Sequence, residues 1–404
     1  MTITLPDAAW RHRAGLDTLL AALEADRGHA RFVGGMVRDS LLGLPVSDLD
    51  IATVLTPQQV MDRLKAAGIK VVPTGIDHGT VTAVMTSGPV EITTLRHDVS
   101  TDGRRATIAY TDDWREDAAR RDFTINALYA DPVTGEISDY FNGIEDLAAR
   151  RVRFIGDASA RIAEDHLRIL RYFRFLARFG RDEPDAEGYA ACVAAANSLM
   201  ALSRERIADE FLKLLAVNAP GPALRLMVDG GILRPVLPEI DATGVERLAV
   251  LIEREAASAT PPVSLRRLAA LLPRDTGTAD AVGARLKLSN KARKRLIAAL
   301  EITPPSDLPP RTLAWRIGVE SAVDRILLDP SMPLADLSTL QGWTPPVLPI
   351  GGGALIARGL TAGPDVAKAL NEVQEIWVAE GFPDAARVAQ IADQTVSKFQ
   401  RARQ

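Results

Sequence analysis

The chain is short of several features that whole classes of protein need. Its 404 residues include one cysteine, Cys192, which excludes an internal disulfide framework and a zinc site built from several cysteines. No apolar run approaches the roughly 18 residues of a membrane span. The first ten residues include Asp7 and lack the apolar core of a signal peptide. We therefore expect a cytoplasmic protein that has no membrane partner.

A large excess of one charge sign is also missing. Lys and Arg number 48 against 52 Asp and Glu, for a net charge of −4, which argues against a general nucleic-acid coat protein. Local basic patches could still bind RNA, because the potential at a surface depends mainly on nearby charges. The length exceeds one ordinary hydrophobic core, so we expect two to four structural units.

The most informative segment that is present runs from Arg31 to Ile51. Its pattern predicts a short strand, a glycine turn, a short helix and a second strand, at Ala30–Val33, Gly34-Gly35, Met36–Leu42 and Leu49–Thr53. The two glycines, Gly34 and Gly35, would let backbone N–H groups approach a polyphosphate, and Arg38 could pair with it.

Two acids follow in the same segment. Side chains alternate faces along a strand, so Asp48 and Asp50 should project together while Leu49 and Ile51 point into the core. Paired carboxylates repel each other unless a cation lies between them, and few hard oxygen ligands suit Mg²⁺. A glycine turn or a DxD pair alone would as readily be a turn or surface feature.

The order of these motifs, G-G-M-V-R-D-x-L-L-G followed by D-L-D-I-A-T, resembles the nucleotidyltransferase superfamily of DNA polymerase β. Within it, the chain is most similar to bacterial-type CCA-adding enzymes and poly(A) polymerases. Four later segments resemble further motifs of that family: Arg120–Leu128, Asp146 with Arg150 or Arg151, Glu164–Arg168 and Glu205–Glu210. The last of these we interpret as ordering the helices rather than touching substrate.

The resemblance and the helical pattern after Ile144 together predict the fold class and its divisions. We expect an α/β head, similar to the polymerase β palm, followed by an all-α neck, body and tail. The predicted boundaries are 1–143, 144–216, 217–330 and 331–404. In the head, a capping box at Thr56 should start a helix that ends near Ala67, and further strands should span Lys70–Pro73, Thr80–Thr86 and Val90–Leu95.

These acids suggest a two-metal in-line transfer. Asp48 and Asp50 would hold Mg²⁺, and an RNA 3′-hydroxyl would attack the α-phosphate of a bound nucleotide, releasing pyrophosphate. Glu91 lies on a strand that could run beside Leu49–Thr53, so it is a candidate third carboxylate. An exposed strand acid without a catalytic role is the alternative for Glu91.

Base selection would fall to Asp165 and Arg168, three residues apart and neighbours if they share a helix. The carboxylate can accept from the amino group of cytosine or adenine, and the guanidinium can donate to ring acceptors. The family resemblance implies that this pair acts as a protein template. A surface salt bridge between the two is the alternative.

Further nucleotide or RNA contacts are expected from arginines on the same helix and from the second motif. Arg171 and Arg174 belong to a basic stripe, which could also be a solvated face. The resemblance assigns the second motif to the ribose, where Asp122 and Asn126 could share a helix face and Arg121 could hold phosphate. Asp122 could also be a helix N-cap.

The resulting hypothesis is template-independent addition of C, C and A to tRNA 3′ ends from CTP and ATP. The tRNA acceptor end would enter the site, and the tail would grip the tRNA elbow. The alternatives are a poly(A) polymerase, a partial CC-adding or A-adding enzyme, and a noncatalytic RNA-binding protein. The five motifs are shared by the enzymes and do not separate them.

Overall fold

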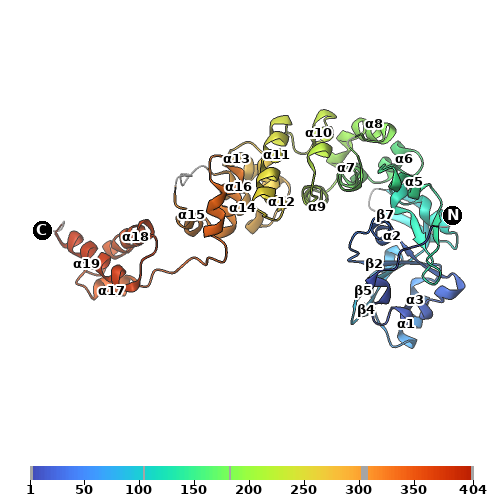
Figure 1. Cartoon of the computed structure of the whole chain (residues 1–404), viewed down its shortest axis with the longest axis horizontal. Coiled ribbons are helices and arrows are strands. Elements are labelled where there is room, and N and C mark those ends of the chain that lie inside the picture. Colours follow the sequence, from blue (N-terminus) through green and yellow to red (C-terminus); the bar gives the residue numbers. More distant parts are fainter. Residues whose placement is uncertain (1–2, 103–104, 182, 302–307, 402–404) are drawn as a thin grey trace. The chain divides into compact units, whose positions relative to one another are not determined.

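The computed structural model describes residues 3–102, 105–181, 183–301 and 308–401, with backbone alone within 98–108. These residues form two compact units, Met1–Pro238 and Glu239–Gln404 (Figure 1). Every named strand of the described chain lies before residue 140, and the described elements that follow, from Gly143 to Arg401, are helices. The predicted fold class is therefore confirmed, whereas the finer boundaries at 143, 216 and 330 stay predictions.

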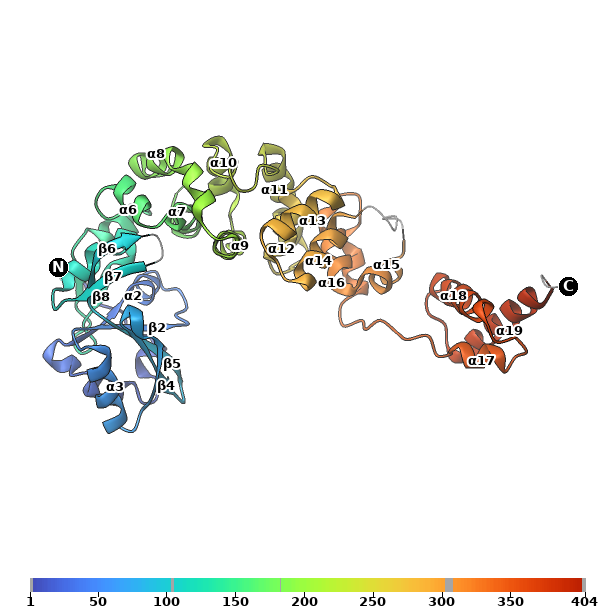
Figure 2. The ribbon, with the colours of Figure 1, turned by 180° about the vertical axis from the view of Figure 1, so that it is seen from behind.

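The head contains a seven-stranded sheet and a separate two-stranded hairpin, β6–β7 (Figure 2). The sheet order is β3-β4-β5-β2-β1-β8-β9, in which only β2 and β5 pair in parallel. The strands are β1 Ala30–Val33, β2 Leu49–Thr53, β3 Lys70–Gly75, β4 Thr80–Met85, β5 Gly88–Thr94, β6 Arg96–Asp102, β7 Arg105–Tyr110, β8 Leu128–Ala130 and β9 Ile137–Asp139.

Short helices connect these strands. They are α1 Leu16–Ala22, α2 Gly35–Leu41, α3 Pro57–Ala66, α4 Trp114–Ala119 and α5 Gly143–Ala148, with 3-10 turns η1 Ala9–His12, η2 Ala25–Arg27, η3 Ile76–His78 and η4 Thr124–Asn126. The capping box predicted for α3 is present: the Thr56 hydroxyl accepts from the Gln59 N–H, and the Gln59 side chain accepts from the Thr56 N–H. It fixes where the helix starts.

Five α-helices complete the first unit. They are α6 Ala158–Glu164, α7 Leu167–Phe179, α8 Ala186–Ala194, α9 Arg204–Leu215 and α10 Gly221–Asp229, with the 3-10 turn η5 Ala196–Ala201. Helix α7 packs against α6, α9 and α10. Its apolar residues, such as Ile169, Leu170 and Phe173, are buried, so its arginines are left along the other side, as the amphipathic pattern predicts.

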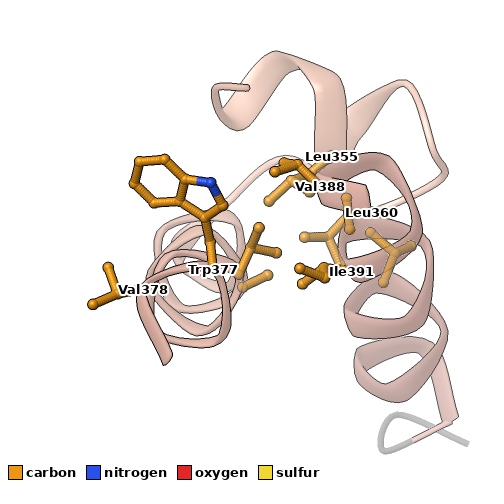
Figure 3. Packing of buried hydrophobic residues seen from close by; sticks show 10 residues of the cluster. Leu355, Leu360, Trp377, Val378, Val388 and Ile391 are labelled. Atoms are coloured by element: carbon orange, nitrogen blue, oxygen red, sulfur yellow. The ribbon is translucent and has the colours of Figure 1, made fainter. Parts of the chain in front are cut away.

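The second unit is helical throughout its described residues. Its helices are α11 Ala242–Ala257, α12 Ser264–Leu271, α13 Thr276–Arg285, α14 Asn290–Leu300, α15 Pro310–Ile317, α16 Val319–Leu328, η6 Leu334–Thr339, α17 Gly352–Ile356, α18 Pro364–Ala379 and α19 Ala385–Arg401. The last three helices share a core, in which Leu355, Leu360 and Ile391 converge between α17, α18 and α19 (Figure 3). None of the described helices is long and apolar enough to cross a bilayer.

A buried ion network lies in the same unit. Arg266, 2% exposed, donates to Glu255 on α11 (2.7 Å) and to Asp324 on α16 (2.8 Å). Arg267 and Arg295 pair with the same two acids. Buried charges are tolerated only when they are paired, and these pairs join α11, α12, α14 and α16.

Candidate active site

The glycine turn begins where β1 ends. Gly34 adopts φ 73° and ψ −129°, a conformation that favours glycine. A Cβ there would also lie 3.2 Å from Nη1 of Arg121 and 3.6 Å from the Asn126 carbonyl oxygen. Position 34 therefore has to be glycine both for its backbone angles and for the close approach of the second motif.

The predicted carboxylates lie on neighbouring strands. Asp50 in β2 is directly opposite Glu91 in β5, in parallel register, so the two side chains share one face of the sheet. The prediction that the strand of Glu91 runs beside Leu49–Thr53 is confirmed. Asp48 precedes β2, where the Ser47 hydroxyl donates to it at 2.8 Å, and the Asp50 N–H donates to Sδ of Met36 on α2 at 3.2 Å.

Asp50 is affected electrostatically by the two other acids. Burial raises the pKa of Asp50 to about 6, the charges of Glu91 and Asp48 add to the increase, and the charge of Arg121 opposes it. A divalent cation would relieve this cost, so the chemistry of the acids fits a metal. Across the described ranges, however, no three acid, histidine or cysteine side chains are close enough to form a metal site.

A cleft of about 490 Å³ lies beside the glycine turn. Its walls come from α2, the second motif, α7 and α9, and it is lined by Gly34, Gly35, Arg38, Arg121, Asp122, Asn126, Asp165, Leu167, Arg168, Arg171, Phe175 and Arg206. It thus brings together nearly all the predicted nucleotide-binding residues. The two predicted metal ligands, Asp48 and Asp50, the candidate third carboxylate Glu91, and Arg174 are not among the lining residues.

Each of the five arginines in the lining is paired with a carboxylate. The pairs are Arg38–Asp39 (2.7 Å), Arg121–Asp117 (3.3 Å), Arg168–Glu164, Arg171–Asp122 (2.5 Å) and Arg206–Asp165 (2.8 Å). A guanidinium has five N–H donors, so each arginine keeps further donors for a ligand while its position is fixed by the acid. The cleft is therefore suited to an anionic, hydrogen-bonding ligand.

The second motif does not form the α-helix over which Asp122 and Asn126 were expected to share a face. It forms the short turn η4, whose N-cap is Phe123 rather than Asp122. The two side chains still meet, because Asn126 Nδ2 donates to Asp122 Oδ1 at 2.9 Å. Burial alone would raise the pKa of Asp122, but the charge of Arg171 and these hydrogen bonds outweigh burial and lower it. Asp122 is therefore an ionised acceptor.

The two residues predicted to select the base, Asp165 and Arg168, do not share a helix, contrary to prediction. Helix α6 ends at Glu164 and α7 begins at Leu167, so Asp165 lies between them in an extended conformation, with φ −150° and ψ 105°. Its carboxylate accepts from Nη2 of Arg206 and from the Leu167 N–H. The described ion pair of Arg168 is with Glu164, so the alternative of an Asp165–Arg168 salt bridge is also wrong. Both side chains nevertheless line the cleft.

The remaining arginines of α7 are anchored rather than solvated. Arg174 pairs with Glu210 on α9, and its guanidinium carbon lies 4.5 Å from the centre of the Phe175 ring. Both Nε and Nη2 of Arg171 donate to Asp122. The fifth motif is interpreted as ordering the helices; its Glu210 pairs with Arg174, whereas its Arg206 lines the cleft. The spacing of α9 alone gave no sign of that contact.

Two known protein families match parts of this chain. Residues 30–153 match the family described as "Poly A polymerase head domain", and residues 183–243 match "Probable RNA and SrmB- binding site of polymerase A". Human mitochondrial CCA tRNA nucleotidyltransferase 1 is 33% identical over 398 residues, which cover 95% of this chain and 90% of the relative. The zebrafish (Danio rerio) protein of the same name is 35% identical, with 90% and 86% covered.

Solved structures give the same result. The Bacillus stearothermophilus CCA-adding enzyme in complex with CTP aligns with a TM-score of 0.75 and 27% identity, covering 96% of this chain and 99% of that one. The Thermotoga maritima CCA-adding enzyme complexed with tRNA shares the fold, with a TM-score of 0.69 at 20% identity. Since likeness to named relatives extends over nearly the whole length, this chain belongs to the family of CCA-adding tRNA nucleotidyltransferases.

Proposed function

We propose that this protein adds C, C and A in turn to tRNA 3′ ends, using CTP and ATP and releasing pyrophosphate. The observation that carries the proposal is the cleft, whose lining contains Asp165 and Arg168 together with the glycine turn and Arg121. Protein side chains suited to a base edge are thus combined with groups suited to a polyphosphate. The full-length likeness to CCA-adding enzymes supports the same reading.

The acids of β2 and β5 fit a divalent ion, which we propose is Mg²⁺. Asp48 and Asp50 would hold it, and Glu91 stays a candidate third carboxylate; the ion would make a 3′-hydroxyl more acidic and offset charge on the α-phosphate. The 3′-oxygen attacks the α-phosphorus in line, and pyrophosphate leaves on the opposite side. Asp50 is positioned for this role by its strand register with Glu91.

The nucleotide would be held at three points. The glycine turn, Gly34-Gly35, contacts the phosphates together with Arg38 and Arg121. Asp122 and Asn126 lie next to the ribose, where Asp122 is itself held by Arg171. The resemblance of the second motif supports this ribose assignment.

Base choice would come from Asp165 and Arg168. The carboxylate of Asp165 accepts from the exocyclic amino group that cytosine and adenine share, while Arg168 donates to ring acceptors. Uracil and guanine would place a carbonyl oxygen against the carboxylate, at a cost of about 1–3 kcal/mol by analogy with other base-edge contacts.

The tRNA would be gripped along its elbow by the second unit. Basic residues cluster on α14, at Lys291 and Arg293–Arg295, and the cluster is partly neutralised because Arg293 pairs with Asp280 and Arg295 with Asp324. Lys291 and Lys294 remain exposed on α14 and are the candidates for phosphate contacts.

We also propose a cytoplasmic location. The human and zebrafish relatives are named as mitochondrial, so cell fractionation is the experiment that tests this location.

One experiment separates the candidate functions. The pure protein is incubated with a tRNA that lacks its terminal CCA, with Mg²⁺ and with each labelled nucleotide singly and together. We expect three additions that need both CTP and ATP and then stop. Long homopolymers from ATP alone would indicate a poly(A) polymerase, addition that stops at CC or adds only A would indicate a partial enzyme, and no incorporation would indicate a binding protein.

A further inference from the structure

Two buried residues that do not line the cleft hold the side chain of Arg121. Asp117 on α4 is 1% exposed and accepts from Arg121 Nη2 at 3.3 Å and from the Tyr129 hydroxyl at 2.6 Å. The Tyr129 oxygen in turn accepts from Arg121 Nε at 3.2 Å. These three bonds form a closed triangle, so the guanidinium cannot rotate without breaking at least one of them.

The backbone around Arg121 is fixed as well. Arg161 Nη2 donates to the Arg121 carbonyl oxygen at 2.8 Å, and Arg168 Nη2 donates to that of Arg120 at 3.3 Å. Arg120 itself donates to Asp117 at 2.7 Å. The main chain and the side chain are thus held by separate sets of partners, one from α6 and α7 and the other from α4 and β8.

The orientation that results is specific. The Nε–Nη2 edge of the guanidinium faces Tyr129 and Asp117, so the Nη1 side, which none of these three bonds uses, lies over Gly34. The same charge acts on Asp50. Arg121 therefore presents donors between the glycine turn and the carboxylates, where the phosphates of a nucleotide would lie.

We propose that Asp117 and Tyr129 are positioning residues, which hold Arg121 toward the phosphate chain that CTP and ATP have in common. This inference rests on the proposed function. An arginine that is already fixed loses less conformational entropy on binding than a free one. We refer to Asp117 and Tyr129 together as the clamp. Because the clamp acts on the shared phosphates, it should affect both nucleotides equally, whereas Asp165 and Arg168 affect the choice between bases.

Two mild substitutions test the clamp. Tyr129→Phe removes one oxygen, and Asp117→Asn removes one charge. We expect each to raise the KM for CTP and the KM for ATP by the same factor, roughly 5- to 20-fold from the loss of bonds to a charged group. The KM for tRNA and the preference for CTP over UTP should stay as in the wild type. Inhibition by added pyrophosphate should weaken by a similar factor.

The control is Tyr140→Phe. The Tyr140 ring lies 6.0 Å from that of Tyr129 in an edge-to-face contact, and its hydroxyl accepts from Arg31 rather than from Arg121. This variant loses a partly buried tyrosine hydroxyl from the same region that is not bonded to Arg121, so its nucleotide KM should not change. Thermal unfolding shows whether each variant is folded. If Asp117→Asn is not folded, the test of the clamp rests on Tyr129→Phe.

The equilibrium affinity for CTP, measured by calorimetry without tRNA, separates this inference from the proposed function. Weaker CTP binding by both variants supports the clamp even if the wild type extends no tRNA, a result that would overturn the proposed function alone. Wild-type CTP binding in folded Tyr129→Phe would overturn the clamp. A changed CTP-to-UTP preference in that variant would also overturn it, because the clamp would then act on the base.

Discussion

Asp165 and Arg206 form an ion pair across the cleft, with 2.8 Å between Oδ2 and Nη2, although 41 residues separate them in the sequence. The pair joins the α6–α7 junction to α9. Arg206 therefore orients the Asp165 carboxylate, which we propose reads the base. Among the described ion pairs, Arg206 is the partner of this carboxylate.

Replacing Arg206 with Ala should lower kcat/KM for CTP and ATP on the order of tenfold, because the Asp165 carboxylate loses a charged hydrogen bond and its fixed orientation. Single-turnover incorporation on tRNA measures the change. Arg204→Ala is the matched control: Arg204 lies on the same helix, two residues earlier, and is not part of the cleft lining. Equal losses in the two variants would contradict a specific role for Arg206.

Asp165→Ala should change selectivity more than total incorporation. Without the carboxylate, UTP and GTP no longer place a carbonyl against a negative charge, so their incorporation relative to CTP and ATP should rise about 5- to 100-fold, in line with 1–3 kcal/mol for a base-edge contact. Parallel reactions with the four nucleotides measure the ratio. An unchanged nucleotide profile would show that base choice lies elsewhere.

Asp50→Asn should abolish nucleotide incorporation yet stabilise the metal-free protein near neutral pH. Burial and neighbouring acids raise the Asp50 pKa from 3.8 to about 6, so the folded state binds its proton more tightly than the unfolded chain does. Stability is therefore lost as the pH rises from about 4 to about 6, and the deficit persists above that range. Partial exposure limits it to about 1–2 kcal/mol.

Thermal unfolding in EDTA across this pH range checks the sign. The midpoint of Asp50→Asn should exceed that of the wild type above pH 6, and the difference should vanish near pH 4. Added Mg²⁺ should stabilise the wild type and have much less effect on the variant. A pH-independent difference would mean that Asp50 is not strained by its neighbours.

Arg266→Met should destabilise the second unit without affecting the nucleotide site. Removal of one partner from a buried ion network costs about 3–5 kcal/mol, and the lower end is expected because Arg267 and Arg295 still pair with its acids. Thermal unfolding measures the loss, while CTP affinity should not change, since the cleft lies within Met1–Pro238.

A surface pair in the same unit serves as the comparison. Arg316 pairs with Glu375, and the two side chains are 36% and 57% exposed. Arg316→Met should therefore cost less than about 1 kcal/mol. A similar loss in both variants would argue that burial does not set the strength of the network.

Local patterns predicted much of the head correctly. The alternation of Leu49, Asp50 and Ile51 placed Asp50 on the face opposite the core, and the capping box set the start of α3. Both depend on neighbours in the chain, so a single sequence contains the information. The position of Glu91 beside Asp50 followed from the same alternation once the two strands were assumed to pair.

Contacts between distant segments could not be predicted in this way. The sequence predicts that Asp165 and Arg168 share a helix, but Asp165 lies outside both helices and accepts from Arg206, which lies on α9. Asp117 is an acid in the first turn of α4, and only the approach of Tyr129 from β8 shows its contact with the second motif. In each case a tertiary hydrogen bond overrides or adds to the local preference.

The pairing of every arginine in the cleft lining with an acid also bears on how quickly a nucleotide arrives. At distances beyond about 10 Å, the electric field of each such pair is that of a dipole rather than that of a positive charge. Long-range attraction of the triphosphate is therefore weak, and the whole chain, at −4, adds none. The association rate for CTP should consequently vary little with ionic strength, since capture depends on short-range bonds formed after a chance encounter rather than on electrostatic steering.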